Sequence, residues 1–523
     1  MSKIMKATIS LMIATAFAKI LGFARELVLA SSYGATMYSD AYITASNIPI
    51  VIFTIIGGTL STVLIPMYFD ISGEKGESLA LKYINNVFNL VIISCIIISV
   101  LGVIFTEDLV KVFAMGFEGE SFKVTVSFTR VIIIGIVATG LSYIMTAYLQ
   151  IKNNFTIPGL ISIPKNIIII ASIILSIKYN PYIMVWGTLI GMSTEFLFQL
   201  PYAIKQGYRY EPYVNIKDKY IKNTIILICP VLIGVAVNQV NTMVDRTLAS
   251  TLVEGSVSAL NYANKLNTFV MGLFILSVSA VMYPTLSKLS INKNSPKEDF
   301  VKFTDTIVSS INSVILLVMP ISIGAIVLST PIVKILFERG EFDSRATTMT
   351  AIALIMYSVG MVACGINDLL TKIFYSLHDT KTPMIIGVIT VVLNIVLNLI
   401  LIRYLKLAGL ALGTSLAFIV NAILLFCLLR KKIGNFSQDK ILKTGAKSMI
   451  SSIIMGIITS FSYKIFYSSL GTSMIDEIIA LSGAVIVGVV SYGILIILFK
   501  VEEIEILKNI LRSKVKNRVL REN

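Results

Sequence analysis

The sequence is poor in charge, histidine and cysteine. Only 14% of its 523 residues are charged, whereas a soluble protein carries about 25%. It has one histidine and four isolated cysteines, which lack the spacing of a zinc site. It also has no His-Glu-x-x-His, Gly-x-Ser-x-Gly or nucleotide-binding phosphate-loop motif. We therefore expect neither an enzyme nor a resident metal site built from thiolates and imidazoles.

Long apolar runs dominate the chain. Hydrophobic residues make up 56% of it, and the mean hydropathy is +0.85. A membrane span needs about 20 mostly apolar residues, and fourteen segments meet this condition. They lie at residues 10–31, 39–65, 83–105, 122–148, 157–177, 181–204, 223–248, 257–286, 303–328, 347–374, 382–401, 409–429, 444–467 and 475–499. The sequence therefore predicts an all-α, multi-pass membrane protein with fourteen transmembrane helices.

The basic residues are distributed unevenly between alternate loops. The loops and termini on one predicted side hold 27 Lys and Arg, and those on the other side hold 7. Because cytoplasmic loops carry the excess of Lys and Arg, we expect both termini in the cytoplasm and the first span retained. This topology accounts for the formal net charge of +15 without a nucleic-acid partner. The basic segment 508–521 has interleaved apolar residues and is typical of an amphipathic helix on an anionic leaflet.

An internal repeat divides the chain. The motif at residues 109–113 (Leu-Val-Lys-Val-Phe) recurs at 332–336 (Ile-Val-Lys-Ile-Leu), each in a short amphipathic stretch after a span. Other matches share this offset of about 220 residues, which corresponds to six spans, and parallel repeats of this kind are a transporter architecture. We expect a six-helix N-lobe, a pseudo-symmetric six-helix C-lobe, a C-terminal helix pair and a basic tail, at residues 1–206, 207–432, 433–499 and 500–523.

Charged residues lie inside the predicted spans. Lys19, Arg25 and Glu26 belong to the first span, Asp40 opens the second and Lys265 lies in the eighth. A charge at bilayer depth costs roughly 2.5–3.5 kcal/mol and usually marks a substrate or ion path. Lys19 and Glu26 could pair as neighbours on one helix face, but cations remain in excess. A cationic cavity suits an anionic substrate, because ammonium and guanidinium groups bind phosphate oxygens.

A second polar cluster combines one carboxylate with amide, hydroxyl and carbonyl oxygens. Its members are Asp245, Asn394, Asn398, Leu410 (through its carbonyl) and Thr414. Such oxygens are ligands for a small hard cation. The simpler alternative is hydrogen bonding between membrane helices, worth about 0.6 kcal/mol for each bond. Arg246 could also pair with Asp245.

The opening of the chain contains a specific motif. Residues 19–26 (Lys-Ile-Leu-Gly-Phe-Ala-Arg-Glu), 33–35 (Tyr-Gly-Ala) and 39–42 (Ser-Asp-Ala-Tyr), followed by Ser256–Ala263, resemble the MurJ (MviN) family. These proteins are lipid II flippases of the multidrug/oligosaccharidyl-lipid/polysaccharide exporter superfamily. The resemblance covers nearly the whole chain. It implies fourteen helices in two lobes plus a terminal pair.

The resemblance also implies a function and site residues. It predicts alternating-access export of undecaprenyl-pyrophosphate-linked peptidoglycan precursor across the bacterial cytoplasmic membrane, with membrane lipids and the cell-wall synthesis machinery as partners. Arg25 matches an essential family arginine, Asp40 matches an acidic residue, and Lys19 and Lys265 stand where arginines are usual. A family sodium site maps onto Asp245, Asn394, Asn398, Leu410 and Thr414. No other cofactor is implied.

The chain departs from the family pattern at several cavity positions. Phe53 stands where many members have an arginine, and Gly58 lies where they often have an acidic residue. These departures leave open a related cargo such as a teichoic-acid or capsule precursor. Three further alternatives are a cation-coupled drug exporter, a membrane-embedded glycosyl- or acyltransferase and a non-transporting scaffold. The first predicts an acidic cavity, the second catalytic pairs, and the third needs no cavity charges.

Overall fold

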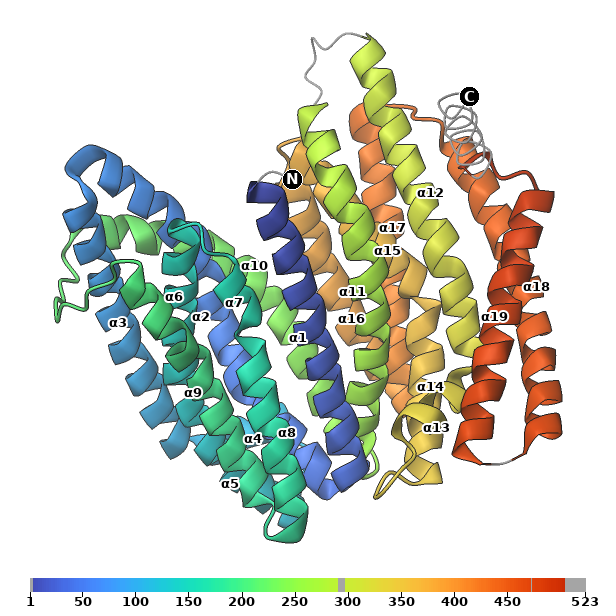
Figure 1. Cartoon of the computed structure of the whole chain (residues 1–523), viewed down its shortest axis with the longest axis horizontal. Coiled ribbons are helices and arrows are strands. Elements are labelled where there is room, and N and C mark those ends of the chain that lie inside the picture. The colour runs from blue at the N-terminus through green and yellow to red at the C-terminus, as the bar shows by residue number, and fades with distance from the viewer. Residues whose placement is uncertain (1–2, 290–296, 472, 504–523) are drawn as a thin grey trace, which may run out of the picture. The chain divides into compact units, whose positions relative to one another are not determined.

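The computed structural model describes residues 3–289, 297–471 and 473–503, with some side chains inside the long helices left out. All regular elements of the described chain are helices, and the described residues contain no strand (Figure 1). This confirms the predicted all-α fold. The amphipathic tail predicted at 508–521 lies outside the described residues.

Nineteen α-helices and one 3-10 turn make up the described chain. Their bounds are α1 Lys3–Tyr33, α2 Met37–Lys75, α3 Glu77–Ile104, α4 Thr106–Phe113, α5 Gly119–Ile132, η1 Ile133–Gly135, α6 Ile136–Ile151, α7 Thr156–Leu160, α8 Ser162–Lys178, α9 Tyr182–Lys205, α10 Lys219–Ser250, α11 Ser256–Lys288, α12 Lys297–Val327, α13 Ser329–Phe337, α14 Ser344–Val359, α15 Met361–Ser376, α16 Lys381–Leu405, α17 Leu407–Ile433, α18 Gln438–Leu470 and α19 Met474–Leu498.

Many of these helices can cross a bilayer. Within the described residues, nine are long and apolar enough, and the pair α14 and α15, bent by 46°, makes a tenth candidate. The nine are α3, α5 with η1 and α6, α7 with α8, α9, α12, α16, α17, α18 and α19. The chain is therefore a multi-pass membrane protein, and the number fourteen stays a prediction.

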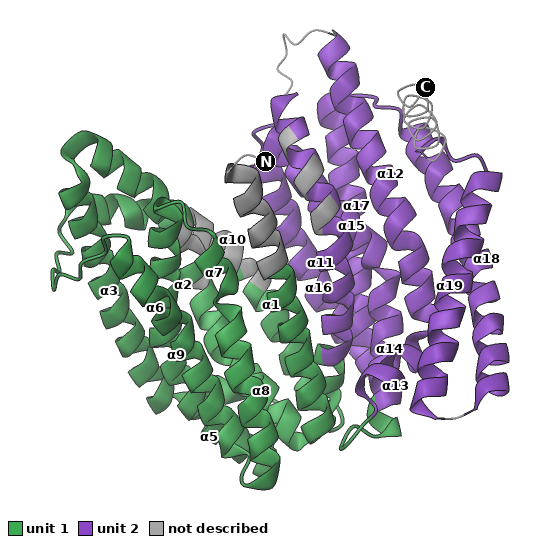
Figure 2. Ribbon diagram, viewed as in Figure 1, with its two compact units in different colours: residues 1–261, 339–346 green, residues 262–338, 347–523 purple. Residues whose placement is uncertain are grey.

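The chain forms two compact units, coloured separately in Figure 2. Unit 1 contains residues 1–261 and 339–346, and unit 2 contains residues 262–338 and 347–523. Three asparagines of α3 tie the loop between α9 and α10 to unit 1 by donating to its backbone carbonyls. These bonds are Asn85 to Arg209 (2.8 Å), Asn86 to Asn215 (3.0 Å) and Asn89 to Glu211 (3.0 Å). The predicted lobe boundaries at 206 and 432 stay predictions.

Helix α2 is central to unit 1 and packs against α3, α5, α6 and α10, while α1 packs against α8. Phe53 of α2 is fully buried, and its ring centroid lies 5.5 Å from that of Tyr143 on α6. Gly140 permits this packing, because a Cβ there would lie 2.8 Å from Cys95 Sγ and 3.2 Å from the Phe53 ring. The aromatic residue at this departure from the family pattern is thus part of the apolar core.

Unit 2 is built from helix pairs. Helix α12 packs against α15 and α18, α17 packs against α15 and α16, and α18 packs against α19. The Tyr492 hydroxyl of α19 donates to the Leu316 carbonyl of α12 at 3.0 Å and bonds Ser448 of α18 at 2.9 Å. Lys334 of α13 forms an ion pair with Glu477 of α19. These bonds attach the last two helices to the rest of unit 2.

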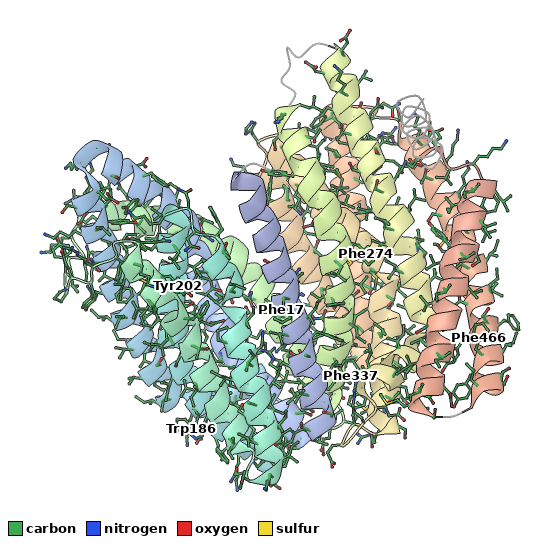
Figure 3. All side chains as sticks on the ribbon, in the orientation of Figure 1. Phe17, Trp186, Tyr202, Phe274, Phe337 and Phe466 are labelled. Carbon is green, nitrogen blue, oxygen red and sulfur yellow. The ribbon has the colours of Figure 1, made fainter. Side chains whose placement is uncertain are left out.

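Both units expose apolar side chains, as lipid-facing helices do. Trp186 of α9 points outward and is 51% exposed (Figure 3). Ile486 and Val489 of α19 are 63% and 66% exposed. A soluble protein would place a polar face on such helices, so these surfaces fit contact with hydrocarbon.

Candidate functional site

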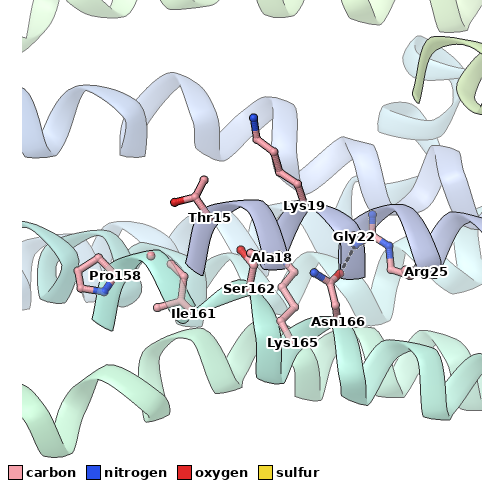
Figure 4. Close-up of a pocket in the computed structure, with 11 residues that line it drawn as sticks. Thr15, Ala18, Lys19, Gly22, Arg25, Pro158, Ile161, Ser162, Lys165 and Asn166 are labelled. Carbon is pink, nitrogen blue, oxygen red and sulfur yellow. Dashed lines mark hydrogen bonds between the residues drawn. The ribbon is translucent and has the colours of Figure 1, made fainter. Parts of the chain in front are cut away.

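A cationic pocket lies in unit 1 between α1 and the α7–α8 segment. Its volume is about 410 Å³. Lys19 and Arg25 of α1 and Lys165 of α8 line it together (Figure 4). The other lining residues are Thr15, Ala18, Gly22, Pro158, Gly159, Ile161, Ser162 and Asn166. Three cations around one cavity can bind an anion, since each donates charged hydrogen bonds.

Arg25 is held in place by hydrogen bonds from both sides. Its Nη2 lies 2.7 Å from Glu26 Oε1, and its Nη1 donates to Asn166 Oδ1 at 3.3 Å. The second Glu26 oxygen accepts from Asn261 Nδ2 at 3.1 Å. Glu26 is buried, while the Arg25 side chain keeps 26% of its surface exposed. The structure shows an ion pair of Glu26 with Arg25, and the pairing of Glu26 with Lys19 stays a prediction.

Lys19 and Lys165 approach the pocket differently. Lys19 is exposed, and in Figure 4 its ammonium group extends away from α8. The Lys165 ammonium lies 3.0 Å from Glu195 Oε1 of α9. Sequence reasoning missed Lys165, Asn166 and Glu195. The available signal was a lysine and a glutamate inside two consecutive predicted spans, because charges at that depth are rare.

Asp40 caps the start of α11. Its carboxylate accepts hydrogen bonds from Gly255 N (2.8 Å), Ser258 N (2.7 Å) and Ser258 Oγ (2.5 Å). A carboxylate at a helix N-terminus satisfies unpaired N–H groups and the helix dipole. These contacts support a positioning role for Asp40, and its predicted contact with cargo-binding cations stays a prediction.

The turns around this cap pack closely. The Glu254 carboxylate accepts from Met37 N at 2.7 Å, and Glu341 N donates to Ser31 O at 3.0 Å. Gly340 has a positive φ of 60°, and a Cβ there would lie 2.1 Å from Ser31 O. A glycine is therefore required at this turn, where residues from distant parts of the sequence meet.

The predicted cation site is only partly assembled within one unit. Asn398 Nδ2 donates to Asn394 Oδ1 at 3.0 Å, and Asn394 Nδ2 lies 3.2 Å from Thr414 Oγ1. The Thr414 hydroxyl in turn donates to the Leu410 carbonyl at 3.1 Å. This chain of bonds joins α16 to α17 in unit 2. Asp245 belongs to unit 1.

The bonds between α16 and α17 fit the simpler interhelical alternative. The cation cage stays a prediction, as does the role of Lys265, an exposed residue in the unit 2 part of α11. Among the described residues, no group of three or more His, Cys, Asp and Glu side chains could hold a metal ion. Any cation at Asp245 would therefore depend on neutral oxygens.

The fold has close relatives among membrane transporters. A solved inward-facing multidrug resistance MATE family transporter of the MOP superfamily is 14% identical, with a TM-score of 0.66 over 80% of this chain and 96% of that one. A solved structure described as lipid II flippase MurJ in an inward closed conformation is 27% identical, with a TM-score of 0.79. It covers 94% of this chain and 99% of that one. The molecule thus has the fold of this class of membrane transporters.

Sequence comparison narrows this class to one family. The pattern that defines the family described as "Lipid II flippase MurJ" matches residues 29–481. A probable lipid II flippase MurJ of Buchnera aphidicola subsp. Baizongia pistaciae is 30% identical over 429 residues, which are 81% of this chain and 83% of that protein. The lipid II flippase MurJ of Burkholderia cenocepacia is 26% identical over 80% of this chain and 82% of that protein.

The chain belongs to the lipid II flippase MurJ family. The resemblance seen in the opening motif is therefore confirmed. Flippases move their cargo without chemical change, so the prediction that the chain is not an enzyme is also confirmed.

Proposed function

We propose that this chain moves lipid II, the undecaprenyl-pyrophosphate-linked peptidoglycan precursor, across the bacterial cytoplasmic membrane by alternating access. Membership of the MurJ family gives the cargo class. The observation that carries the proposal is the pocket lined by Lys19, Arg25 and Lys165, because its charge suits a pyrophosphate. A drug exporter for organic cations would need the opposite charge.

The roles of the site residues follow from their contacts. Arg25 binds the pyrophosphate through the part of its guanidinium that stays exposed, while Glu26 and Asn166 fix its orientation. Lys19 lines the same pocket and adds a further cation. Asp40 fixes the first turn of α11, the helix that carries Lys265, and so acts on cargo binding indirectly. Lys265 contributes a further cation in the transport cycle.

The proposed topology has fourteen spans with both termini in the cytoplasm. Four long helices, α1, α2, α10 and α11, join the ten candidates to reach this number. The proposed six-helix lobes, 1–206 and 207–432, are supported by two repeated irregularities about 220 residues apart. Short helices α4 and α13 follow α3 and α12, and breaks interrupt both α5–α6 and α14–α15. Residues 433–499 form the remaining pair.

A cation is proposed to reset the empty carrier. Asp245 would provide its charge, with Asn394, Asn398, Thr414 and the Leu410 carbonyl as neutral ligands, and Na⁺ is the candidate ion. The membrane potential acting on the cationic pocket is the second proposed source of energy. Besides its lipid-linked cargo and membrane lipids, the cell-wall synthesis machinery is the proposed partner.

Depletion and complementation test this function. Bacteria depleted of their own lipid II flippase accumulate the unexported lipid intermediate in the inner leaflet. Expression of this chain is expected to restore growth and remove the accumulated lipid II. Rescue of a different lipid-linked glycan, identified by mass spectrometry, would instead assign a teichoic-acid or capsule precursor.

A further inference from the structure

An ion pair joins two membrane helices beside the pocket. Lys165 of α8 and Glu195 of α9 are 3.0 Å apart, with 23% and 11% of their side-chain surfaces exposed. Burying such a pair adds little stability, because apolar residues of similar size often replace it without loss. Ionisable residues in membrane spans usually face a functional cavity. The pair therefore points to a use beyond holding α8 against α9.

Lys165 faces the same cavity as the two cations of α1. It lines the pocket with Lys19 and Arg25, and its neighbour Asn166 accepts the hydrogen bond from Arg25. Consecutive residues of α8 thus supply one cation and one fixed acceptor. Lys165 and Arg25 thus line one pocket, and Asn166 holds the Arg25 guanidinium in it.

The carboxylate partner stands on a helix that is firmly held. One turn after Glu195, Gln199 Nε2 donates to Ser142 Oγ at 2.8 Å and to the Glu195 carbonyl at 2.9 Å. Thr146 donates to Gln199 Oε1 at 2.9 Å. These bonds fix α9 against α6. Lys165, with its flexible four-carbon stem, is the member of the ion pair that can change partner.

We propose that Lys165 is a phosphate-binding residue that exchanges Glu195 for a phosphate oxygen when lipid pyrophosphate enters the pocket. This inference rests on the proposed function. Three cations around the pocket face the two carboxylates Glu26 and Glu195, and a diphosphate diester brings one negative charge on each phosphate. Freed from Glu195, Lys165 would contribute a full charge to the cargo. The returning carboxylate competes with phosphate and so promotes release.

Variants of the pair separate this role from a structural one. Inorganic pyrophosphate would be titrated by calorimetry into the detergent-solubilised full chain carrying Glu195→Gln, or Lys165→Met with Glu195→Gln. The single variant is expected to bind pyrophosphate about tenfold more tightly, since one bond of 1.4 kcal/mol corresponds to that factor. The double variant, which leaves no unpaired charge, is expected to bind more weakly than the wild-type chain.

Two controls make the result decisive. Lys178→Met, at the other end of α8, should leave pyrophosphate affinity unchanged, and Lys165→Arg should preserve most of it. Melting temperatures without ligand report whether each variant is folded. Equal affinities for the wild-type chain, the Glu195→Gln variant and the double variant would overturn the inference, because a purely structural pair predicts that equality.

Complementation distinguishes this inference from the proposed function. If the wild-type chain restores lipid II export and the double variant does not, both stand. If the wild-type chain and the folded double variant restore export equally, the role of Lys165 is rejected and the function stands. If the wild-type chain fails to restore export although its pyrophosphate affinity depends on Lys165, the proposed function is rejected and the pocket's anion chemistry stands.

Discussion

The helix hairpins α8–α9 and α16–α17 use the same packing for different polar groups. Each second helix carries two glycines four residues apart where it crosses its partner. Cβ atoms at Gly187 and Gly413 would lie 2.0 Å from Ser172 Cβ and 2.2 Å from Asn398 Oδ1. Small residues at this spacing let membrane helices approach closely. The two hairpins therefore share close helix packing at glycines, and this packing does not involve charged side chains.

Their polar residues differ in kind and in place. The α8–α9 hairpin holds the ion pair Lys165–Glu195, whereas the α16–α17 hairpin holds the neutral bonds of Asn394 with Asn398 and Thr414. The segments that precede the two hairpins show the opposite contrast, because the polar side chain is neutral before α8–α9 and charged before α16–α17. Neutral Asn154 accepts from Ile157 N before α8, while Asp379 before α16 accepts from Thr382 N and pairs with Lys432 at 2.5 Å.

This difference shows that two membrane helices can pack as a hairpin without charged side chains inside the bilayer. The α16–α17 hairpin closes with neutral amides, and its ion pair stands outside the spans. The buried ion pair of α8–α9 is then explained by its position beside the pocket. The following experiments test this contrast in order of expected effect.

The largest effect is expected from the pocket itself. Arg25→Ala should abolish growth of flippase-depleted cells, because it removes the guanidinium that binds pyrophosphate and leaves Glu26 without its cation. Membrane levels of the variant, measured by immunoblot, should match the wild type. Arg403→Ala, at the end of α16, is the matched control and should grow normally. Normal growth with Arg25→Ala would reject the pocket as the cargo site.

Glycine substitutions test the shared packing. Gly187→Ala and Gly413→Ala should each destabilise the protein by about 1–3 kcal/mol, because the added methyl overlaps a neighbouring side chain. Gly387→Ala is the control, since a Cβ there meets nothing within 4 Å and alanine favours helix. Thermal unfolding in detergent measures all three. A large loss in only one hairpin would break the parallel between them.

Sodium titration tests the neutral hairpin. Addition of Na⁺ should raise the melting temperature of the wild-type chain, and Asp245→Ala should remove this increase because the site loses its charged ligand. Asn394→Ala should reduce it and cost about 0.6 kcal/mol without sodium. If sodium has the same effect on the Asp245→Ala variant as on the wild type, the cation site is rejected and only interhelical bonding remains for the asparagines.

The smallest effect is expected at Asp379. Burial raises the pKa of this carboxyl, but the hydrogen bonds from Lys432 and Thr382 outweigh it and bring the pKa to about 2. The stabilisation is therefore complete above the unfolded pKa, roughly 3.9, and is lost as the pH falls towards 2. Melting curves of the wild type and Asp379→Asn should differ above pH 5 and converge at lower pH. A constant difference between them would contradict this assignment.

Local features could be predicted from the sequence, but contacts between residues far apart in the chain could not. Apolar length identifies the helices, and the repeat motifs anticipated the short helices α4 and α13. Arg25 stood out because charge in an apolar run is visible in one dimension. The pairing of Lys165 with Glu195, thirty residues away on another helix, depends on how α8 and α9 pack. The same holds for Asp40, whose partners Gly255 and Ser258 are more than 200 residues away.

The central claim is that this chain carries lipid II outward through a cationic pocket. It is tested most directly by measuring how much lipid II is exposed at the outer leaflet of flippase-depleted cells that express the chain. The account predicts that the wild-type chain restores this exposure and that Arg25→Ala, present at the same level, does not. Lipid II that stays in the inner leaflet despite normal membrane levels of the wild-type chain would contradict it.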